Sequence, residues 1–168
     1  MEHWKTLVEI RDSPFGKGLF AKHDLQQGTV ITTLKGRKVN FQATLALSEE
    51  SHALQTGFDR YLICGAPFIY ANHSCNPNTA INDELRMFCL KNIAAGQELL
   101  WDYSTSMLER HWNMSCSCKE ERCRKIVTDF DLLPRQIQDE YLKAKIVMPF
   151  IAEFLRSRKK AAHVHARL

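Results

Sequence analysis

Three cysteines lie within eight residues in the segment CSCKEERC, at positions 116, 118 and 123. Most of the residues between them are charged, so these thiols cannot all pack into a hydrophobic core. In a reducing compartment, this spacing is typical of a structural zinc site. Zinc takes four ligands in a closed tetrahedron, so a fourth side chain must come from elsewhere. The segment therefore requires two distant parts of the chain to meet.

Four side chains outside this segment are candidates for the fourth ligand: Cys75, His73, His111 and Cys89. Cys75 lies in the polar stretch YANHSCNPN, which can present a ligand. Cys89, like Cys64, lies in an apolar run where a free cysteine behaves as a small hydrophobe. Chance clustering and a redox pair are the alternatives to zinc. A nucleophilic pair of Cys75 with His73 is disfavoured, because catalytic Cys and His residues normally come from distant segments.

The chain predicts one domain with β-structure first and α-structure last. Turn signals separate short apolar runs at 7–10, 18–21, 30–35, 61–64, 86–90 and 99–103. No regular helices flank these runs, so a parallel doubly wound sheet is not expected. One helix is predicted from Phe41 to about Ser48, with Asn40 as its N-cap.

A second helix is predicted near the C-terminus, where apolar residues recur at i, i+4, i+7 and i+11 from Ile137 to Met148. Pro134 suits its first turn, and Pro149 is expected to break it and begin a second, short helix.

Charge and hydropathy exclude several classes of protein. The 168 residues carry a net charge of +4, but residues 156–168 hold five Lys/Arg and no acid. The remainder has 18 basic against 19 acidic residues, which does not favour a nucleic-acid-binding face. No apolar run suits a membrane span, and the first ten residues do not resemble a signal peptide. A cytoplasmic protein is the default expectation, because RSRKK is too weak a nuclear signal.

Two further motifs are weak when taken alone. SPFGKGLFA places Gly16 and Gly18 around Lys17, which allows close backbone approach to a ligand but more often marks a simple turn. GQELLWDYS ends in Asp102 and Tyr103, and this tyrosine is either a packed aromatic residue or a phenol placed at a reacting centre.

Together, the order and spacing of FGKGLFA, NHSCNPN, GQELLWDY and CSCKEERC resemble one family. They are similar to SET-domain protein lysine methyltransferases with a cysteine-rich post-SET segment, over residues 5–125. The resemblance implies a fold that is mostly β with C-terminal α: short curled sheets with a pseudoknot, as in compact bacterial-type members. It divides the chain into a SET domain at 5–106, a post-SET zinc segment at 107–126 and a C-terminal helical extension with a basic tail at 127–168.

The resemblance implies a binding site for S-adenosylmethionine. Gly16, Lys17 and Gly18 correspond to the turn whose backbone lines the cofactor pocket. Asn72 and His73 correspond to the pair that grips the cofactor, largely through backbone groups.

The same resemblance assigns the catalytic and metal sites. Tyr103 corresponds to the catalytic tyrosine beside the cofactor, and Tyr70 and Trp101 are expected to line the substrate channel. Trp101 stands where the family usually carries Phe or Tyr, a position that influences how many methyl groups fit. Ile69 and Tyr70 lie where most members carry an Arg-Phe pair. The four ligands of one structural zinc are then Cys75, Cys116, Cys118 and Cys123.

The activity implied is methyl transfer to a lysine ε-amine of a histone or another basic protein. A monomer that requires neither nucleic acid nor membrane is expected, and a nuclear or host-delivered location is the alternative to the cytoplasm. Two other functions compete with this one. One is an inactive, zinc-stabilised SET-fold binding module, and the other is a nucleic-acid-binding zinc protein, which the near-neutral body disfavours.

Overall fold

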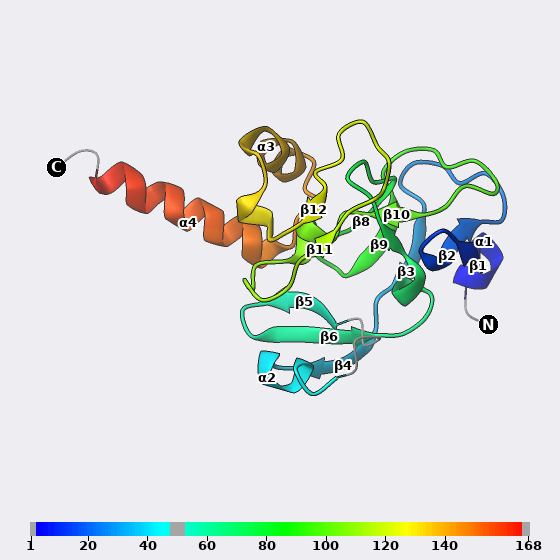
Figure 1. Cartoon of the computed structure of the whole chain (residues 1–168), viewed down its shortest axis with the longest axis horizontal. Coiled ribbons are helices and arrows are strands. Elements are labelled where there is room, and N and C mark those ends of the chain that lie inside the picture. The colour runs from blue at the N-terminus through cyan, green and yellow to red at the C-terminus, as the bar shows by residue number, and fades with distance from the viewer. Residues whose placement is uncertain (1–2, 48–52, 166–168) are drawn as a thin grey trace.

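The structure is a computed structural model that describes residues 3–47 and 53–165 (Figure 1). Small sheets form the body, and the last helix projects from one side of it. The strands are β1 (Val8–Ser13), β2 (Gly16–Ala21), β3 (Val30–Thr33), β4 (Gly36–Val39), β5 (Ala53–Gly57), β6 (Arg60–Cys64), β7 (Asn72–His73), β8 (Thr79–Ile81), β9 (Arg86–Cys89), β10 (Leu100–Trp101), β11 (Met114–Ser115) and β12 (Ile126–Val127). The helices are α1 (Trp4–Leu7), α2 (Phe41–Thr44), α3 (Arg135–Lys143) and α4 (Pro149–His165), with 3₁₀ turns η1 (Phe68–Tyr70), η2 (Tyr103–Ser106) and η3 (Phe130–Leu132).

The strands form five small sheets rather than one large one. Their orders are β1-β2, β3-β9-β8, β4-β6-β5, β10-β7 and β11-β12. Every pairing is antiparallel except that of β7 with β10, which is parallel. The prediction of a mostly β fold of short sheets with C-terminal helices is confirmed.

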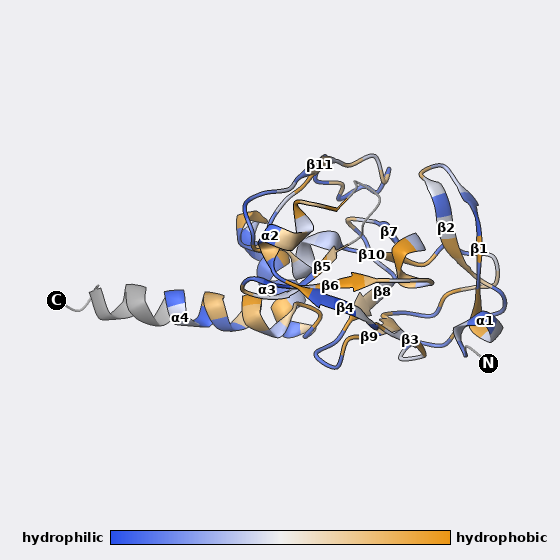
Figure 2. Ribbon diagram, turned by 90° about the horizontal axis from the view of Figure 1, so that it is seen from below, coloured by the Kyte–Doolittle hydropathy of each residue, from blue (hydrophilic) through white to orange (hydrophobic). Residues whose placement is uncertain are grey.

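One main core joins the sheets to the C-terminal helices. Leu19, Ile31 and Leu99 come from the part of the chain that forms the sheets and are fully buried, and Ile151 of α4 packs into the same cluster. Figure 2 shows apolar residues on β6 and on the part of α4 nearest the body. A smaller core contains Cys75, Cys116, Met107 and Val127. No described helix has the length and hydropathy that a membrane span requires.

Helix α2 begins as predicted and ends early. The Asn40 side chain accepts a hydrogen bond from the Ala43 backbone N–H at 2.9 Å, which confirms the N-cap. The helix ends at Thr44, and the expected last residue, Ser48, lies outside the described residues.

The C-terminal helices differ from the prediction in length. Helix α3 ends at Lys143, because Lys145 adopts a left-handed backbone with φ +56°, and so Ala144 and Met148 lie beyond it. Pro149 does begin α4, but that helix has 17 residues and is not the short helix that was predicted. The basic residues from 156 to 160 continue α4 and do not form a separate tail.

Several strands were not predicted, because they lack a two-residue hydrophobic period. Three of the four residues of β4, GRKV, are exposed, and all three residues of β8, TAI, are buried. The strand expected over 99–103 is only β10, because Asp102 caps the turn η2 and stops the extended backbone.

Candidate active site

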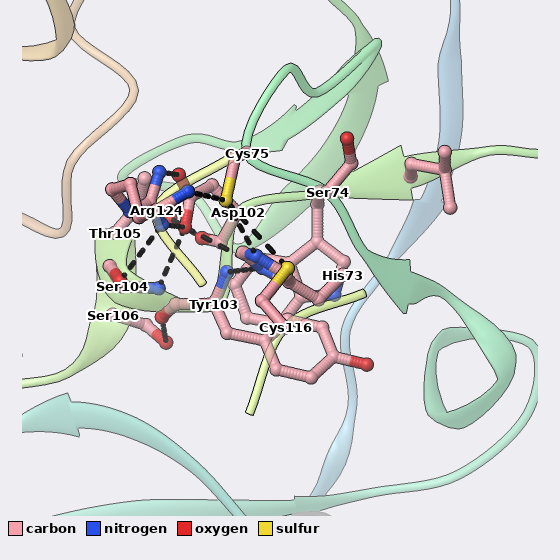
Figure 3. Close-up of polar contacts among 12 residues, drawn as sticks. His73, Ser74, Cys75, Asp102, Tyr103, Ser104, Thr105, Ser106, Cys116 and Arg124 are labelled. Carbon is pink, nitrogen blue, oxygen red and sulfur yellow. Dashed lines mark hydrogen bonds and ion pairs between the residues drawn. The ribbon is translucent and has the colours of Figure 1, made fainter. Parts of the chain in front are cut away.

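The parallel pairing of β7 with β10 brings two distant motifs side by side. Asn72 is paired with Leu100, and His73 is paired with Trp101. The NHSC motif therefore lies directly against the segment that leads into Tyr103, the arrangement that the expected pseudoknot requires. Figure 3 shows His73, Cys75, Tyr103 and Asp102 gathered in this region.

The four cysteines assigned to the metal meet in space. Their sulfur atoms all lie within 4.8 Å of one another, and those of Cys75 and Cys116 are 3.8 Å apart. Cys75 follows β7, and the other three lie between β11 and the start of β12. All of them are free thiols. Of the other ligand candidates, Cys89 is buried within β9, and His111 packs edge-on against Phe41 at 5.1 Å.

This donor set suits zinc. Four thiolates at Zn–S distances of about 2.3 Å lie about 3.8 Å apart at the corners of a tetrahedron. The Cys75–Cys116 sulfur separation of 3.8 Å meets that requirement, and all four sulfurs lie within 4.8 Å of one another. Two N–H groups reach Cys75 Sγ, from the Arg124 backbone at 3.4 Å and from His73 Nε2 at 3.4 Å. Burial raises the pKa of the Cys75 thiol, so metal binding must release its proton.

Asn72 is held by three acceptors on the other side of β7. Its amide nitrogen donates to Glu98 Oε1 at 2.7 Å, to the Lys17 carbonyl at 3.0 Å and to Ser13 Oγ at 3.2 Å. Gly18 makes this arrangement possible, since a Cβ atom there would collide with the Glu98 carboxylate. The glycine-rich turn thus contacts Asn72 directly, and the same amide nitrogen is held by Glu98, a residue that was not among the predicted site residues.

The turn between β1 and β2 exposes its backbone. Gly16 adopts φ +99°, a conformation that side chains disfavour, and this allows the tight reversal. The Lys17 ammonium pairs with Asp12, and both side chains are largely exposed. Lys17 therefore contributes to the site through its backbone carbonyl, which accepts from Asn72, while its ammonium group is paired with Asp12.

His73 is buried between the cysteine cluster and the tyrosine. Nε2 contacts Cys75 Sγ at 3.4 Å, and Nδ1 accepts a hydrogen bond from the Tyr103 backbone N–H at 3.3 Å. Nδ1 is an acceptor, so the proton resides on Nε2 of a neutral ring. Burial lowers the pKa of His73 to about 4, against the opposing effect of Asp102. The imidazole thus links Cys75 to Tyr103, and only the backbone of His73 is left for a cofactor.

Tyr103 occupies an aromatic site with a polar end. Its ring centroid lies 4.9 Å from Trp101, 5.2 Å from His73 and 6.4 Å from Trp112. Its hydroxyl donates to the Ala71 carbonyl at 3.0 Å. Burial, with a smaller contribution from the Glu98 carboxylate, raises the pKa of Tyr103 to about 12. The phenol is therefore protonated at neutral pH.

The two expected channel residues differ in their placement. Trp101 is buried beside Tyr103, and its indole Nε1 donates to the same Ala71 carbonyl at 3.1 Å. Tyr70 lies in η1 and packs against the main core. In the described part of the chain, no hydrogen bond or ring contact joins Tyr70 to Tyr103.

Sequence reasoning missed three parts of the site. Trp112 stands half-exposed beside Tyr103, and an aromatic residue in a polar segment was the signal that could have found it. Asp102 is fully buried and pairs with Arg124, which directly follows a cysteine of the cluster. The Ala71 carbonyl has no signal in the sequence, since any residue carries one.

Comparisons with known proteins agree with this geometry. The family described as SET domain matches residues 16–104, more than half of the chain. The histone-lysine N-methyltransferase trr of Drosophila melanogaster is 25% identical over 142 residues, which span 74% of this chain and 6% of that protein. A histone-lysine N-methyltransferase of Saccharomyces cerevisiae, H3 lysine-36 specific, is 30% identical over 148 residues, which span 74% of this chain and 20% of that protein. The chain thus spans a small part of these relatives.

A solved structure shares the fold. The crystal structure of KRYPTONITE in complex with mCHG DNA and SAH superposes with a TM-score of 0.59 at 20% sequence identity, over 72% of this chain and 29% of that one. The resemblance that the four motifs indicated is confirmed by the family match. This chain belongs to the SET-domain family.

Proposed function

We propose that this protein is an S-adenosylmethionine-dependent protein-lysine N-methyltransferase. The observation that carries the proposal is the pairing of β7 with β10. This pairing places Asn72, together with the glycine-rich β1–β2 turn bonded to it, beside the aromatic site of Tyr103. A methyl donor and an amine acceptor need two such sites side by side. Two of its relatives are named histone-lysine N-methyltransferases, which supports the same reaction class.

Asn72 and the β1–β2 turn would hold the cofactor. The Asn72 amide nitrogen is occupied by Glu98, Lys17 and Ser13, so its amide oxygen is the side-chain atom that would contact a cationic group such as the cofactor's ammonium. The absent side chain of Gly18 leaves room for the Glu98 carboxylate, which holds Asn72 in this position. When bound, S-adenosylmethionine supplies an electrophilic methyl group on a sulfonium.

The aromatic site prepares the lysine. A free ε-amine has a pKa of about 10.4, so about one in a few thousand is neutral at pH 7, which costs roughly 4–5 kcal/mol. Trp101, Tyr103 and Trp112 provide apolar surroundings, which penalise the ammonium and lower its pKa. The proton is thus lost to water before the amine is enclosed.

Tyr103 orients the amine and is not a general base. Its proton is donated to the Ala71 carbonyl, so its oxygen can accept a hydrogen bond from an amine N–H. This contact directs the nitrogen lone pair toward the methyl group, and such alignment supplies much of the rate in a displacement reaction. A phenol with its pKa raised to about 12 stays protonated while it does so.

The zinc is proposed to be structural. Cys75, Cys116, Cys118 and Cys123 would fill all four positions, which leaves none for a reacting ligand. A structural zinc contributes on the order of 10 kcal/mol to folding, enough to order a short polar segment. The metal would hold the 107–126 segment, with Trp112, against Tyr103.

We propose a lysine-containing protein, a histone tail or another basic protein, as substrate, and a monomeric enzyme that needs no nucleic acid. A cytoplasmic location is proposed as the default, with a nuclear or host-delivered one as the alternative. The relatives whose names specify histones support the substrate class alone.

The test has two parts, both with zinc-loaded protein. Calorimetry with S-adenosylmethionine is expected to show one binding site per chain, and a lysine-peptide array with mass readout is expected to show additions of methyl mass. If calorimetry detects no binding, the enzyme proposal fails. If the cofactor binds and no peptide or histone is methylated, the chain is an inactive SET-fold binding module.

A further inference from the structure

Asp102 is a buried carboxylate that directs the turn on which Tyr103 lies. Its side chain has no exposed surface. One oxygen accepts a hydrogen bond from the Ser104 backbone N–H at 3.1 Å and so caps η2, whose first residue is Tyr103. The position of this carboxylate therefore determines the backbone direction from which the Tyr103 ring projects.

Arg124 holds both oxygens of that carboxylate. Its Nη1 lies 2.7 Å from Oδ2 of Asp102, and its Nη2 lies 2.7 Å from Oδ1 (Figure 3). Nη2 also donates to Ser104 Oγ at 3.3 Å. A bidentate guanidinium fixes the plane of a carboxylate as well as its charge, which a single ammonium cannot do.

The backbone of Arg124 is fixed by the cysteine cluster. Arg124 directly follows Cys123, and its N–H donates to Cys75 Sγ at 3.4 Å. Arg124 thus contacts the cysteine cluster through its backbone and the turn that carries Tyr103 through its side chain. Its side chain is 8% exposed, so water does not compete for the pair.

A second, exposed pair provides an internal comparison. Arg122 binds Glu140 of α3 through two hydrogen bonds, at 3.2 and 2.8 Å, with the side chains 40% and 47% exposed. Arg122 leaves the same loop two residues earlier and reaches α3 rather than η2. Tyr141 of α3 donates to Asp102 Oδ2 at 3.1 Å, so Asp102 keeps one neutral side-chain donor when Arg124 is changed.

We propose that Arg124 is a positioning residue for methyl transfer, which acts through Asp102 to hold Tyr103 and so makes the geometry of the reacting tyrosine depend on an ordered cysteine segment. The inference rests on the proposed function for its kinetic consequence. It assigns the cysteine segment a second task, alignment of Tyr103, besides closing the site.

The deciding variant is Arg124→Lys, with Arg122→Lys as its matched control. Lysine keeps the positive charge and the backbone N–H to Cys75, but it loses the bidentate contact with Asp102. We expect Arg124→Lys to retain zinc and to bind S-adenosylmethionine as the wild type does. Its kcat should fall roughly 100-fold with little change in KM, the loss typical of a reacting group displaced by about 1 Å. Arg122→Lys should keep the wild-type kcat.

A second measurement does not depend on catalysis. Amide hydrogen exchange of residues 103–106 in the zinc-loaded protein should be faster in Arg124→Lys than in the wild type, and unchanged in Arg122→Lys. If the wild type transfers no methyl group, the proposed function fails, while this comparison still decides whether Arg124 orders the turn.

Three results would overturn the proposal. One is a kcat for Arg124→Lys that equals that of Arg122→Lys. Another is exchange at 103–106 that does not change. The third is loss of zinc from Arg124→Lys, since Arg124 would then only build the metal site. The variant Arg124→Met also removes the positive charge, and its kcat should be no higher than that of Arg124→Lys. If Arg124→Met does not fold, the comparison of Arg124→Lys with Arg122→Lys still decides the proposal.

Discussion

Replacing Tyr103 by phenylalanine removes one oxygen atom from the proposed active site. That oxygen donates to the Ala71 carbonyl at 3.0 Å and is the proposed acceptor for the substrate amine. The same carbonyl also accepts the Trp101 indole N–H at 3.1 Å. The Ala71 carbonyl therefore keeps a hydrogen-bond donor after the substitution. A buried acceptor without a donor would have cost much more stability.

These contacts set the expected magnitudes. The lost hydrogen bond should lower the free energy of unfolding by about 0.5–1.5 kcal/mol. For a chain of this size, that corresponds to a fall in Tm of about 1–6 °C. The amine loses its orienting contact, so kcat should fall at least about 100-fold. Affinity for S-adenosylmethionine should change little, because Asn72 and Gly18 are untouched.

The assay is methylation of a substrate peptide at saturating cofactor, with calorimetry and thermal melting on the same samples. Tyr61→Phe is the control, because it removes a hydroxyl bonded to Glu109 at 2.6 Å, a group with no role in the proposed chemistry. It should lower Tm without a comparable loss of kcat. Equal turnover in Tyr103→Phe and the wild type would refute the role of this phenol.

Three further predictions concern the metal, the cofactor and the product. Cys75→Ser should abolish stoichiometric zinc binding, because it removes one of four sulfurs that lie within 4.8 Å of one another; metal analysis that still finds one zinc per chain would contradict the assigned ligand set. Gly18→Ala should weaken cofactor binding about tenfold or more in calorimetry, because its Cβ displaces the Glu98 carboxylate; unchanged affinity would separate Gly18 from the cofactor site. Trp101→Phe should move the product mass spectrum toward higher methyl numbers, because a smaller ring leaves more room beside Tyr103; an identical methyl distribution would show that Trp101 does not limit the channel.

The meeting of the four cysteines was the most predictable part of the site. Thiols in a charged segment have no place in a core, so CSCKEERC predicted a fourth ligand from outside, and Cys75 meets the other three sulfurs. The NHSC motif and the glycine-rich turn could also be recognised in the sequence as family motifs. In both, as in the cysteine segment, the residue types themselves suggested a role beyond packing.

The interactions that hold the site together had no such signal. Arg124 is one of several basic residues in its segment, and only the fold distinguishes it from the exposed Arg122. Glu98 reaches Asn72 through the register of separate strands, which no local pattern encodes. The end of α3 depends on the left-handed backbone at Lys145, where the hydrophobic period continues past the helix. These contacts and this helix end depend on the tertiary structure, which sequence periodicity does not encode.

The separations along the chain have a consequence for folding. The contact between Cys75 and Cys116 joins residues 41 positions apart, and the hydrogen bond between Asp102 and Tyr141 joins residues 39 positions apart. Contacts between such distant segments form slowly, since the intervening chain loses entropy before any contact is made. While the chain is being synthesised, Tyr103 is present long before Arg124 and Tyr141 can hold its turn. The turn that carries Tyr103 therefore gains its full set of side-chain contacts only after the chain has been made as far as Tyr141.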